Sequence, residues 1–519
     1  SLIELLLLAN VNSVEDQSFW NNQANKELRD ALNTKLNHGV AQNVIIFVGD
    51  GMGMSTITAS RIYKGGESYR FAFEQFPHVG LLKTYVVNKQ VPDSASTATS
   101  LFCGVKNNYE TVGVDSFVKH GNCNSSLEKE HQLDSIVKWA QTAGKDTGFV
   151  TTTRVTHATP SALYAHVPYR GWECDTRIPP ESKHCKDIAR QLIEDEPGRN
   201  IKVIMGGGMQ VLKANSTSKE DDPIDAWVCK RGDGKDLIET WKDQKKNMGV
   251  SFKLLTNTQD IRDLDADNTD FILGVFANGH MKMEFERNKT PTGMPSLSEM
   301  TIAALNVLKK NANGFLLVVE GGLIDYAHHR GQARKALDET VAFHQAINET
   351  IDWLAKRNLL KSTLVITTSD HDHGLSMTGY PDRGNDILGI ASKSKITGIP
   401  YTTLTYSTGD LKNYQFTVYN NSKNMVTRID PSNNDTTSFS YSQQTGILTD
   451  EVLHGGADVP IYASGPMAHL FHSVHEQNYV AHVIAYAAKI GPYKSGTTIN
   501  ISSIYLILML VTLQTFLSK

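Results

Sequence analysis

Apolar and polar positions along the chain follow two periodic patterns. Short runs rich in apolar residues, at 44–48, 148–153, 313–319 and 362–369, are typical of strands buried on both faces. Stretches with apolar residues at helical spacing lie at 17–36, 133–143, 298–310, 334–356 and 479–488, and further strand-like runs occur at 79–87 and 459–464. The alternation predicts an α/β fold, a three-layer sandwich with a large, mostly parallel central sheet flanked by helices.

One segment departs from this pattern. Between residues 391 and 453, Thr, Ser, Tyr and Asn dominate in short alternating runs, which predicts a small inserted β subdomain with antiparallel strands and polar turns. The chain has 519 residues, too many for one simple core, yet no Gly/Ser/Pro-rich linker divides it. We therefore expect one α/β body made of residues 14–390 and 454–494, interrupted by the 391–453 insertion.

Both ends of the chain carry patterns typical of processing signals. Residues 2–9 are mostly apolar, and we interpret residues 1–13 as the remnant of a secretory signal peptide. Residues 504–517 are apolar but shorter than the roughly 20 residues of a membrane-spanning helix. Small residues at 495–497 and a polar spacer precede them, which favours a GPI-attachment signal at 495–519 over a stray hydrophobic helix.

These signals predict a protein on the extracellular face of the plasma membrane, held there by a GPI anchor. Secretion would expose N-x-S/T sequons to glycosylation. The candidate sites are Asn124, Asn215, Asn288, Asn348, Asn420, Asn434 and Asn500.

The five cysteines are too few and too scattered for a zinc finger or a dense disulfide framework. In a secreted protein Cys123, Cys174, Cys185 and Cys229 can pair, which leaves Cys103 over. A Cys123–Cys185 bridge would close a loop worth about 4 kcal/mol in the chain-entropy model. Cys174–Cys229 is then the remaining pair, although the sequence alone does not exclude other pairings.

Acids, histidines and hydroxyls follow one predicted strand after another. Because the carboxyl ends of parallel strands meet at one edge of a sheet, these side chains are expected to lie together. Taken singly, each has a simpler explanation, such as Asp50 capping the next helix. Their recurrence favours a metal site instead. The residues are Asp50, His157, Thr159, Glu320, Asp325, His329, Asp370, His371 and His373.

The residue types indicate which metals would bind. Asp325 and His329 are four residues apart, so on a helix both project from one face. Histidine with carboxylate, without thiolate, fits Zn²⁺ in a hydrolytic site. Asp50, Thr159 and Glu320 offer only oxygen atoms, which suits Mg²⁺ completed by water.

A nucleophile and an anion clamp complete the candidate chemistry. Ser94 lies between a strand-like run and a helix-compatible run, so a helix N-terminus could favour a developing alkoxide and a bound phosphate oxygen. Arg170 could hold phosphate oxygens in a bidentate manner. The simpler alternatives are an ordinary N-cap at Asp93 and a solvated arginine.

Together these residues resemble the animal alkaline phosphatases, over nearly the whole chain. The resemblance rests on FVGDGMG at 47–53, DSA at 93–95, TTTRVTH at 151–157, VEGG at 319–322, IDxxxH at 324–329, DHxH at 370–373 and HGG at 454–456. It implies a metal-dependent phosphomonoester hydrolase that forms a phosphoserine at Ser94 and releases inorganic phosphate at the cell surface. Arg170 matches the family's phosphate-clamping arginine.

The resemblance also implies how two Zn²⁺ and one Mg²⁺ are held. The first zinc site would be Asp325, His329 and His454, and the second Asp50, Asp370 and His371, with Ser94 bound to the second. Asp50 would bridge to Mg²⁺, which Thr159 and Glu320 also bind. His157 and His373 would lie just outside the ligands. His454 enters only through the resemblance, because a histidine after a loop is usually a surface or capping residue.

The family further implies a homodimer. Residues 391–453 would form a crown at the interface, Tyr380 would reach toward the partner's site, and the N-terminal helix would embrace the neighbouring subunit. Some positions depart from the mammalian pattern. Phe276, Ala277 and Asn278 replace Phe-Glu-Pro, so we do not predict the family's peripheral Ca²⁺. Tyr326 replaces a frequent His, Thr159 replaces a usual Ser, and the second mammalian disulfide is absent.

The net charge and the sequence motifs argue against several other functions. A net charge of −4 provides no basic footprint for nucleic acid. A phosphodiesterase of the same superfamily would typically use Thr as nucleophile, and a sulfatase a modified Cys or Ser. A non-catalytic adhesion protein would be expected to have lost Ser94, Arg170 or a metal ligand, and all are present.

Overall fold

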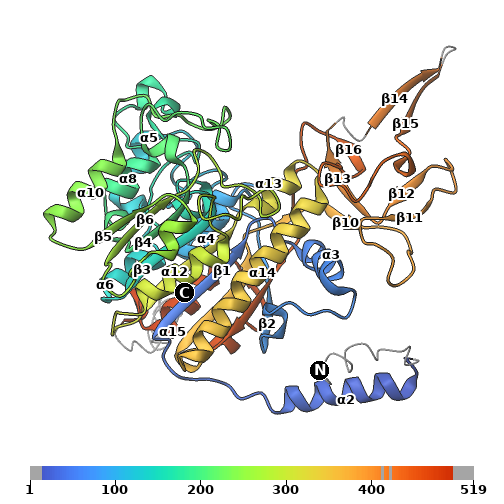
Figure 1. The fold of residues 1–519 in the computed structure, drawn as a ribbon, viewed down its shortest axis with the longest axis horizontal. Coiled ribbons are helices and arrows are strands. Elements are labelled where there is room, and N and C mark those ends of the chain that lie inside the picture. Colours follow the sequence, from blue (N-terminus) through green and yellow to red (C-terminus); the bar gives the residue numbers. More distant parts are fainter. Residues whose placement is uncertain (1–14, 411–413, 420–422, 495–519) are drawn as a thin grey trace, which may run out of the picture.

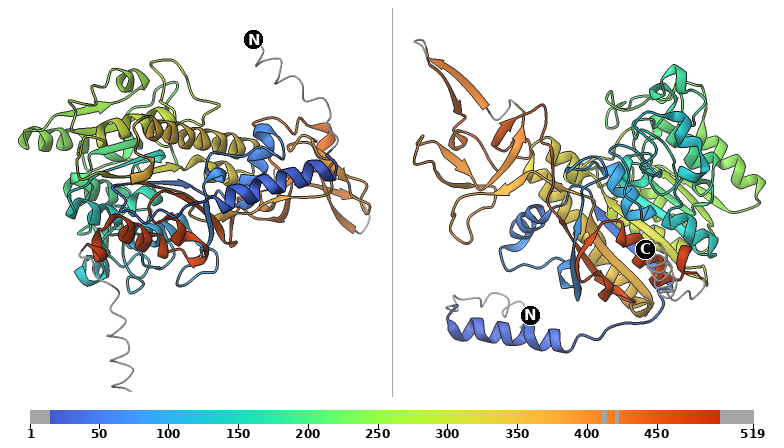
Figure 2. Two further views of the ribbon diagram at one scale, coloured as in Figure 1. Left: turned by 90° about the horizontal axis from the view of Figure 1, so that it is seen from below. Right: turned by 180° about the vertical axis from the view of Figure 1, so that it is seen from behind.

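The computed structural model describes residues 15–410, 414–419 and 423–494 (Figures 1 and 2). A ten-stranded sheet forms the centre of the molecule. Its strands, in spatial order, are β19 (Ser473–Glu476), β2 (His78–Lys83), β18 (Val459–Ser464), β8 (Thr363–Ser369), β1 (Asn43–Gly49), β7 (Phe315–Gly321), β3 (Asp146–Arg154), β4 (Val203–Gly207), β6 (Phe271–Val275) and β5 (Phe252–Leu255). Every pairing is parallel except those of β18, which confirms the predicted mostly parallel sheet.

The central strand β1 explains the three layers. All its residues are buried, and successive side chains point to opposite faces. Val44, Ile46 and Val48 join a core on one face, whereas Ile45 and Phe47 join a second core on the other. Helices cover both faces because each face is apolar, as the runs at 44–48 and 362–369 predict.

The first core packs against helices that include α4 (Ser94–Cys103), α6 (Ile136–Thr142) and α15 (Tyr479–Ala488). The second packs against α12 (Leu297–Leu308) and α14 (Ala333–Lys356). The remaining α-helices of the described residues are α2 (Gln17–Leu32), α3 (Met54–Gly65), α5 (Cys123–Leu127), α7 (Ala158–Ser161), α8 (Ile188–Glu194), α9 (Met209–Leu212), α10 (Leu237–Asn247), α11 (Thr258–Arg262) and α13 (Leu323–His329).

The insertion projects from the α/β body as a separate group of strands (Figure 1). It contains β11 (Ile390–Lys393), β12 (Pro400–Thr402), β13 (Leu404–Gly409), β14 (Tyr414–Tyr419), β15 (Lys423–Arg428) and β16 (Thr445–Leu448), and β10 (Leu375–Met377) pairs with β13. The β11–β12 and β14–β15 pairs are antiparallel as predicted, but β13 and β16 are parallel. Residue alternation is the same in both directions, so the sequence pattern could not distinguish them.

Several predicted elements are shorter in the structure, among them the helix expected at 17–36, which ends at Leu32. The strand expected at 79–87 ends at Lys83, and the helix expected at 133–143 is α6, which begins after Ser135. The Ser135 hydroxyl accepts a hydrogen bond from the Lys138 backbone N–H and caps this helix.

Helix α2 is separate from the three layers. It begins after Asp16, whose side chain accepts a hydrogen bond from the Phe19 N–H, and none of its residues is buried. Figures 1 and 2 show it lying apart from the body at the end of an extended segment.

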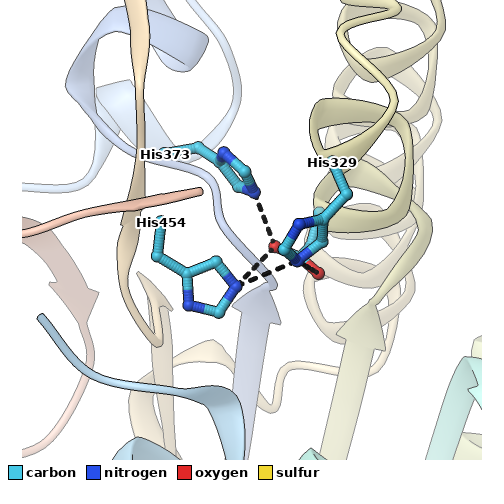
Figure 3. Close-up of side chains that lie close together, drawn as sticks. His329, His373 and His454 are labelled. Atoms are coloured by element: carbon cyan, nitrogen blue, oxygen red, sulfur yellow. Dashed lines mark hydrogen bonds and ion pairs between the residues drawn. The ribbon is translucent and has the colours of Figure 1, made fainter. Parts of the chain in front are cut away.

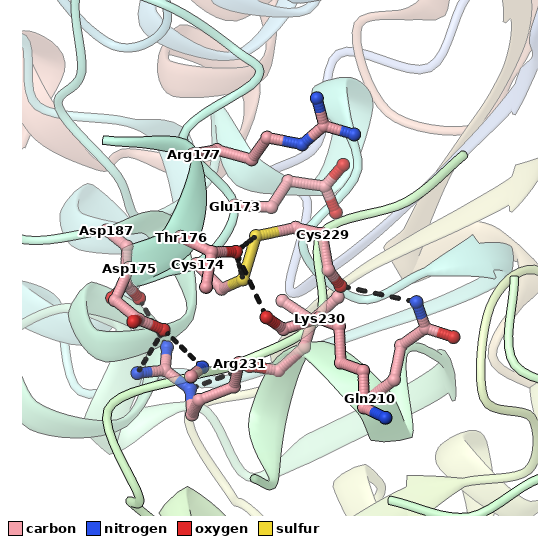
Figure 4. Close-up of a disulfide and its surroundings, with 12 residues drawn as sticks. Glu173, Cys174, Asp175, Thr176, Arg177, Asp187, Gln210, Cys229, Lys230 and Arg231 are labelled. Carbon is pink, nitrogen blue, oxygen red and sulfur yellow. Dashed lines mark hydrogen bonds and ion pairs between the residues drawn. A yellow bond between two sulfur atoms is a disulfide. The ribbon is translucent and has the colours of Figure 1, made fainter. Parts of the chain in front are cut away.

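Both proposed disulfides are present, and Cys103 is free and buried. Figure 4 shows the Cys174–Cys229 bridge beside the buried Arg231, whose Nη2 lies 2.8 Å from Asp187 Oδ1. Within the described residues, no helix is both long and apolar enough to cross a membrane. The two terminal signals, Asn420 and Asn500 lie outside the described residues.

Candidate active site

The carboxyl ends of four adjacent strands, in the order β8, β1, β7 and β3, form the floor of the site. Asp50 follows β1, Glu320 lies near the end of β7, and Asp370 follows β8. All three side chains are buried. The parallel register therefore brings together carboxylates that are far apart in the sequence.

Ser94 is the first residue of α4 and is 1 % exposed. Its Oγ lies 3.1 Å from His371 Nε2 and 3.4 Å from Asp50 Oδ1. Asp93 is the N-cap, and its side chain accepts hydrogen bonds from the Ala95 and Ser96 N–H groups. The N-cap explanation of this motif is confirmed, and the same cap holds Ser94 against the candidate metal ligands.

Asp325, His329, His373 and His454 form one candidate metal cluster (Figure 3). The His329 and His454 Nε2 atoms are 3.0 Å apart, and His373 Nε2 lies 3.1 Å from Asp325 Oδ1. His454 reaches this place because β17 (His454–Gly455) pairs with β9 (Asp372–His373), opposite His373. The first residue after the insertion, His454, therefore lies in the candidate metal cluster.

The adjacent histidines of α13 have different environments. His328 is fully buried, with Nε2 2.9 Å from Thr56 Oγ1 and Nδ1 2.7 Å from Tyr406 Oη. Both its ring nitrogens are occupied, whereas His329 Nε2 faces Asp325 Oδ2 at 3.2 Å. Only His329 is therefore placed to bind a metal, as the four-residue spacing from Asp325 predicts.

A second group surrounds His371. Its Nε2 lies 3.4 Å from Asp50 Oδ1 and 3.3 Å from Asp370 Oδ2, and all three residues are 0 % exposed. Asp50, Asp325 and His371 also lie close enough together to share an ion. The structure thus brings together the residues of the second predicted zinc site beside Ser94.

Three buried side-chain oxygen atoms without hydrogen-bond partners indicate a third candidate metal site. Asp50 Oδ2, Thr159 Oγ1 and Glu320 Oε1 make no hydrogen bond, although all are inaccessible to solvent. The other Glu320 oxygen accepts hydrogen bonds from Thr151 and Thr153. Because unpaired buried polar atoms are costly, three of them fit a cation site. These are the three residues predicted to hold Mg²⁺.

The buried carboxylates of the site also favour bound cations. Burial and the neighbouring Asp370 carboxylate raise the pKa of Asp50 well above its usual range. Burial likewise raises the pKa of Glu320 to about 7 and that of Asp370 to about 6. Several buried carboxylates are thus costly to ionise together, and bound cations would remove that cost.

Arg170 is held at the mouth of the site by side-chain and backbone contacts. Its Nη1 lies 3.2 Å from Asp93 Oδ2, and its Nη2 lies 3.2 Å from His157 Nε2. Glu110 has a left-handed φ of 62°; its N–H donates to Asp93 Oδ1, and its carbonyl accepts from the Arg170 N–H. Asp93 belongs to the DSA motif at 93–95, but no local pattern in the sequence predicts its contact with Arg170.

Other predicted residues lie elsewhere. Tyr380 is fully exposed. The peptide N–H of Asn278 donates to the Asp222 carboxylate, and Ala277 is buried. Tyr326 stacks edge-on against His280 and lies under the guanidinium of Arg330.

Comparison with known proteins agrees with this geometry. The family model for alkaline phosphatase matches residues 41–490. The chain belongs to the alkaline phosphatase family. It is 44 % identical to the human tissue-nonspecific alkaline phosphatase, over 92 % of this chain and 89 % of that protein. It is 37 % identical to the membrane-bound alkaline phosphatase of Bombyx mori, over 92 % and 86 % of the two chains.

Solved structures share the alkaline phosphatase fold. The enzyme from the Antarctic bacterium TAB5 superposes with a TM-score of 0.58 at 24 % identity, covering 87 % of this chain and 99 % of that one. The Thermus thermophilus alkaline phosphatase gives a TM-score of 0.59 at 21 % identity, covering 88 % and 93 %.

The chain is therefore an enzyme, a metal-dependent phosphomonoesterase. The family match covers both the nucleophile motif and the candidate metal ligands. It therefore favours a phosphomonoesterase over a phosphodiesterase, a sulfatase or an adhesion protein.

Proposed function

We propose that this alkaline phosphatase hydrolyses phosphomonoesters through a phosphoserine at Ser94, with two Zn²⁺ and one Mg²⁺ bound. The observation that carries the proposal is the position of Ser94, with its Oγ 3.1 Å from His371 Nε2 and 3.4 Å from Asp50 Oδ1. The zinc sites would be Asp325, His329 and His454, and Asp50, Asp370 and His371. Thr159, Glu320 and Asp50 would hold Mg²⁺.

The donor atoms fit these metals. Imidazole nitrogen with carboxylate oxygen is the ligand set of hydrolytic zinc, and the unpartnered oxygens of Asp50, Thr159 and Glu320 are the type that Mg²⁺ prefers. When bound, such ions stabilise negative charge on oxygen and lower the pKa of a coordinated hydroxyl or water.

The reaction then uses the chain's own groups in two displacements. Ser94 Oγ attacks phosphorus, the bond to the ester oxygen breaks, and the alcohol leaves with a proton. Water next attacks the phosphoserine, which releases inorganic phosphate and restores the hydroxyl. Arg170, fixed by Asp93, would hold non-bridging oxygens in both steps. The Ala95 and Ser96 N–H groups at the start of α4 are taken by Asp93, so this helix would favour the same oxygens through its dipole.

Ser94→Ala tests the nucleophile. We expect the variant to bind metals like the wild type, to form no phosphoserine detectable by mass spectrometry, and to lose at least about 10³-fold in kcat. Ser100→Ala, a buried serine of the same helix, is the matched control. Full activity in Ser94→Ala would overturn the mechanism. Separately, chelation should abolish p-nitrophenyl phosphate hydrolysis, and Zn²⁺ with Mg²⁺ should restore it.

The domain boundaries belong to the same proposal. We assign residues 14–390 and 454–494 to the catalytic body and 391–453 to the crown. The antiparallel pairing of β11 with β12 and of β14 with β15 supports a separate insertion. In the proposed homodimer, Tyr380 would contact the partner's site, and its full exposure in the single chain is compatible with that role.

We also propose GPI attachment at the extracellular surface. Supporting features are the membrane-bound Bombyx mori relative and the five described sequon asparagines, Asn124, Asn215, Asn288, Asn348 and Asn434, all of which are exposed. A phosphatidylinositol-specific phospholipase should release the phosphatase activity from intact cells into the medium. Activity that stays with the membrane after this treatment, yet is solubilised by detergent, would contradict the proposal.

A further inference from the structure

A group of histidines lies at the edge of the sheet opposite the active site. Strand β2 pairs antiparallel with β18, which pairs antiparallel with β8, so β2 and β8 run in the same direction. His78 is the first residue of β2 and therefore lies at the amino ends of the parallel strands. The catalytic cluster is at their carboxyl ends. Around His78 gather His38, His469 and His472.

The central contact in this histidine cluster joins two imidazoles. His78 Nδ1 lies 2.9 Å from His472 Nε2, with ring centres 4.8 Å apart. The ring centre of His469 is 6.2 Å from that of His78 and 4.8 Å from that of His38. His78 is buried, whereas His472 is exposed, so the pair is open to solvent on one side.

The spacing of this pair matches that in the candidate zinc cluster. His329 Nε2 and His454 Nε2 are 3.0 Å apart, against 2.9 Å for His78 and His472. Two nitrogens on one tetrahedral Zn²⁺ are about 3.4 Å apart, given Zn–N bonds near 2.0–2.1 Å. The His78–His472 pair would thus need to open by only about half an ångström to hold an ion.

A third imidazole, that of His469, lies nearby, but its nitrogens are too far from the pair to share an ion without a side-chain rotation. His469 Nδ1 is inaccessible to solvent and has no hydrogen-bond partner. His469 belongs to a 3₁₀ turn (Ala468–Phe471), and His472 follows it three residues later. Rotation of its side chain would bring a nitrogen toward the pair, and bound metal would satisfy an atom that is otherwise buried without a partner.

The charge state of the cluster suits metal binding. Burial, with His472 and His469 nearby, lowers the pKa of His78 to about 4, so its ring is neutral at physiological pH. Neutral imidazole is the form that binds metal. In the pair, an N–H of one ring donates a hydrogen bond to a nitrogen of the other. A metal ion bound between the two nitrogens would replace that hydrogen.

We propose that His78 and His472, with His469 and water completing the coordination, bind a borderline transition-metal ion such as Zn²⁺. This site is separate from the catalytic centre and does not depend on the proposed mechanism. Imidazole nitrogens favour Zn²⁺, Ni²⁺ and Cu²⁺ over Mg²⁺ and Ca²⁺. The ion would fasten the 468–472 turn to the first residue of β2.

Zinc stoichiometry tests the site. Protein with its catalytic metals bound is dialysed against buffered free Zn²⁺ from about 0.1 to 100 µM, and zinc per chain is measured by mass spectrometry. We expect the wild type to take up one more zinc than His472→Ala. Because His472 is exposed, we expect this substitution to preserve the fold, although it leaves His78 Nδ1 without its partner. Equal phosphatase activity in both proteins would show that the catalytic metals are unchanged.

His184→Ala is the matched control, because it removes an exposed imidazole that contacts Cys123 and Asn124 rather than the cluster. It should bind as much zinc as the wild type. His469→Ala should bind the extra zinc about tenfold more weakly. Zinc should also raise the Tm of the wild type more than that of His472→Ala. Equal zinc content in wild type and His472→Ala up to 100 µM, or loss of the extra zinc in His184→Ala, would overturn the proposal.

Discussion

At the scale of single residues, Asp93 serves two structural purposes. One carboxylate caps α4 through the Ala95 and Ser96 N–H groups and also binds Arg170 at 3.2 Å. Burial alone would raise its pKa, but the Arg170 guanidinium and its hydrogen bonds hold the pKa below the usual range. Asp93 therefore stays ionised and holds the Arg170 guanidinium in place for its proposed role of binding phosphate.

Asp93→Asn should separate these two purposes. Asparagine caps helices as well as aspartate, so α4 should persist, whereas the charge that orients Arg170 is lost. We expect the inhibition constant of inorganic phosphate to rise by about three- to tenfold, with little change in Tm. Asp236→Asn makes the same change at the N-cap of α10 and is the control. An unchanged phosphate inhibition constant would show that Arg170 is oriented without Asp93.

Glu339 makes the stability of the fold depend on pH. This α14 residue is 5 % exposed, and its Oε1 accepts a hydrogen bond from the Glu284 N–H at 2.6 Å. Burial raises its pKa from 4.5 to about 8. The unfolded chain thus ionises Glu339 at lower pH than the folded chain, so the folded state loses stability as pH rises from about 4.5 to about 8.

Glu339→Gln should remove that loss while keeping the acceptor for Glu284. We expect the variant to gain stability relative to the wild type between pH 5 and pH 9, on the order of 4 kcal/mol at the upper end. The measurement is Tm at several pH values, with Glu349→Gln on the same helix as control. A Tm difference that does not change with pH would contradict this assignment.

Some site residues could be predicted from the sequence and others could not. Asp325 and His329 follow from their spacing, because a helix places residues i and i+4 on one face. The partners that occupy the neighbouring His328, Thr56 and Tyr406, lie far away along the chain and could not be predicted. His454 depends on the β17–β9 pairing across the insertion, a contact that no local pattern encodes.

At the scale of elements, buried strands were the most predictable. The apolar runs at 44–48 and 362–369 became β1 and β8, and 459–464 became β18 with the expected bounds. The sequence reading did not single out β4 or β6, which are five residues each and contain glycine. Short runs of this kind do not show enough periodicity to be distinguished from loops.

Several hydrogen bonds join the proposed crown to α13, among them a path through His328 and the contacts of Val452 with His329. Tyr406 of β13 binds His328 of α13, and His328 also binds Thr56 of α3. All three are buried, and α13 carries both Asp325 and His329. The path and the Val452 contacts together hold the helix that presents these two side chains.

Tyr406→Phe should loosen that helix. Removing the hydroxyl leaves His328 Nδ1 unpaired in a buried position, at a cost of about 1–3 kcal/mol. We expect zinc to transfer to a chelator several times faster than from the wild type, followed with a zinc-sensitive dye. Tyr462→Phe, which alters a buried tyrosine of β18, is the control. If Tyr406→Phe and Tyr462→Phe release zinc at the same rate, the Tyr406–His328 hydrogen bond does not influence zinc binding.

At the scale of the whole molecule, α2 has an apolar stripe that the described residues of its own chain leave exposed. Trp20, Ala24, Leu28 and Leu32 recur every fourth residue and so lie on one helix face. The exposed fractions are 48 % for Trp20, 58 % for Leu28 and 76 % for Leu32. A helix with such a face gains stability by covering it. This exposure supports the proposed homodimer, in which the second copy would cover the stripe.

The combined substitutions Leu28→Glu and Leu32→Glu test that arrangement. Placing two charges in an apolar contact should raise the dimer dissociation constant at least about 100-fold, because each buried leucine contributes roughly 1.5–3 kcal/mol. Sedimentation equilibrium at micromolar protein should find the wild type at twice the chain mass and the variant shifted toward the monomer. Gln23→Glu, an exposed polar position on the same helix, should leave the dimer intact. A wild type that sediments as a monomer would remove the homodimer from the proposal, and a variant that stays dimeric would place the interface away from α2.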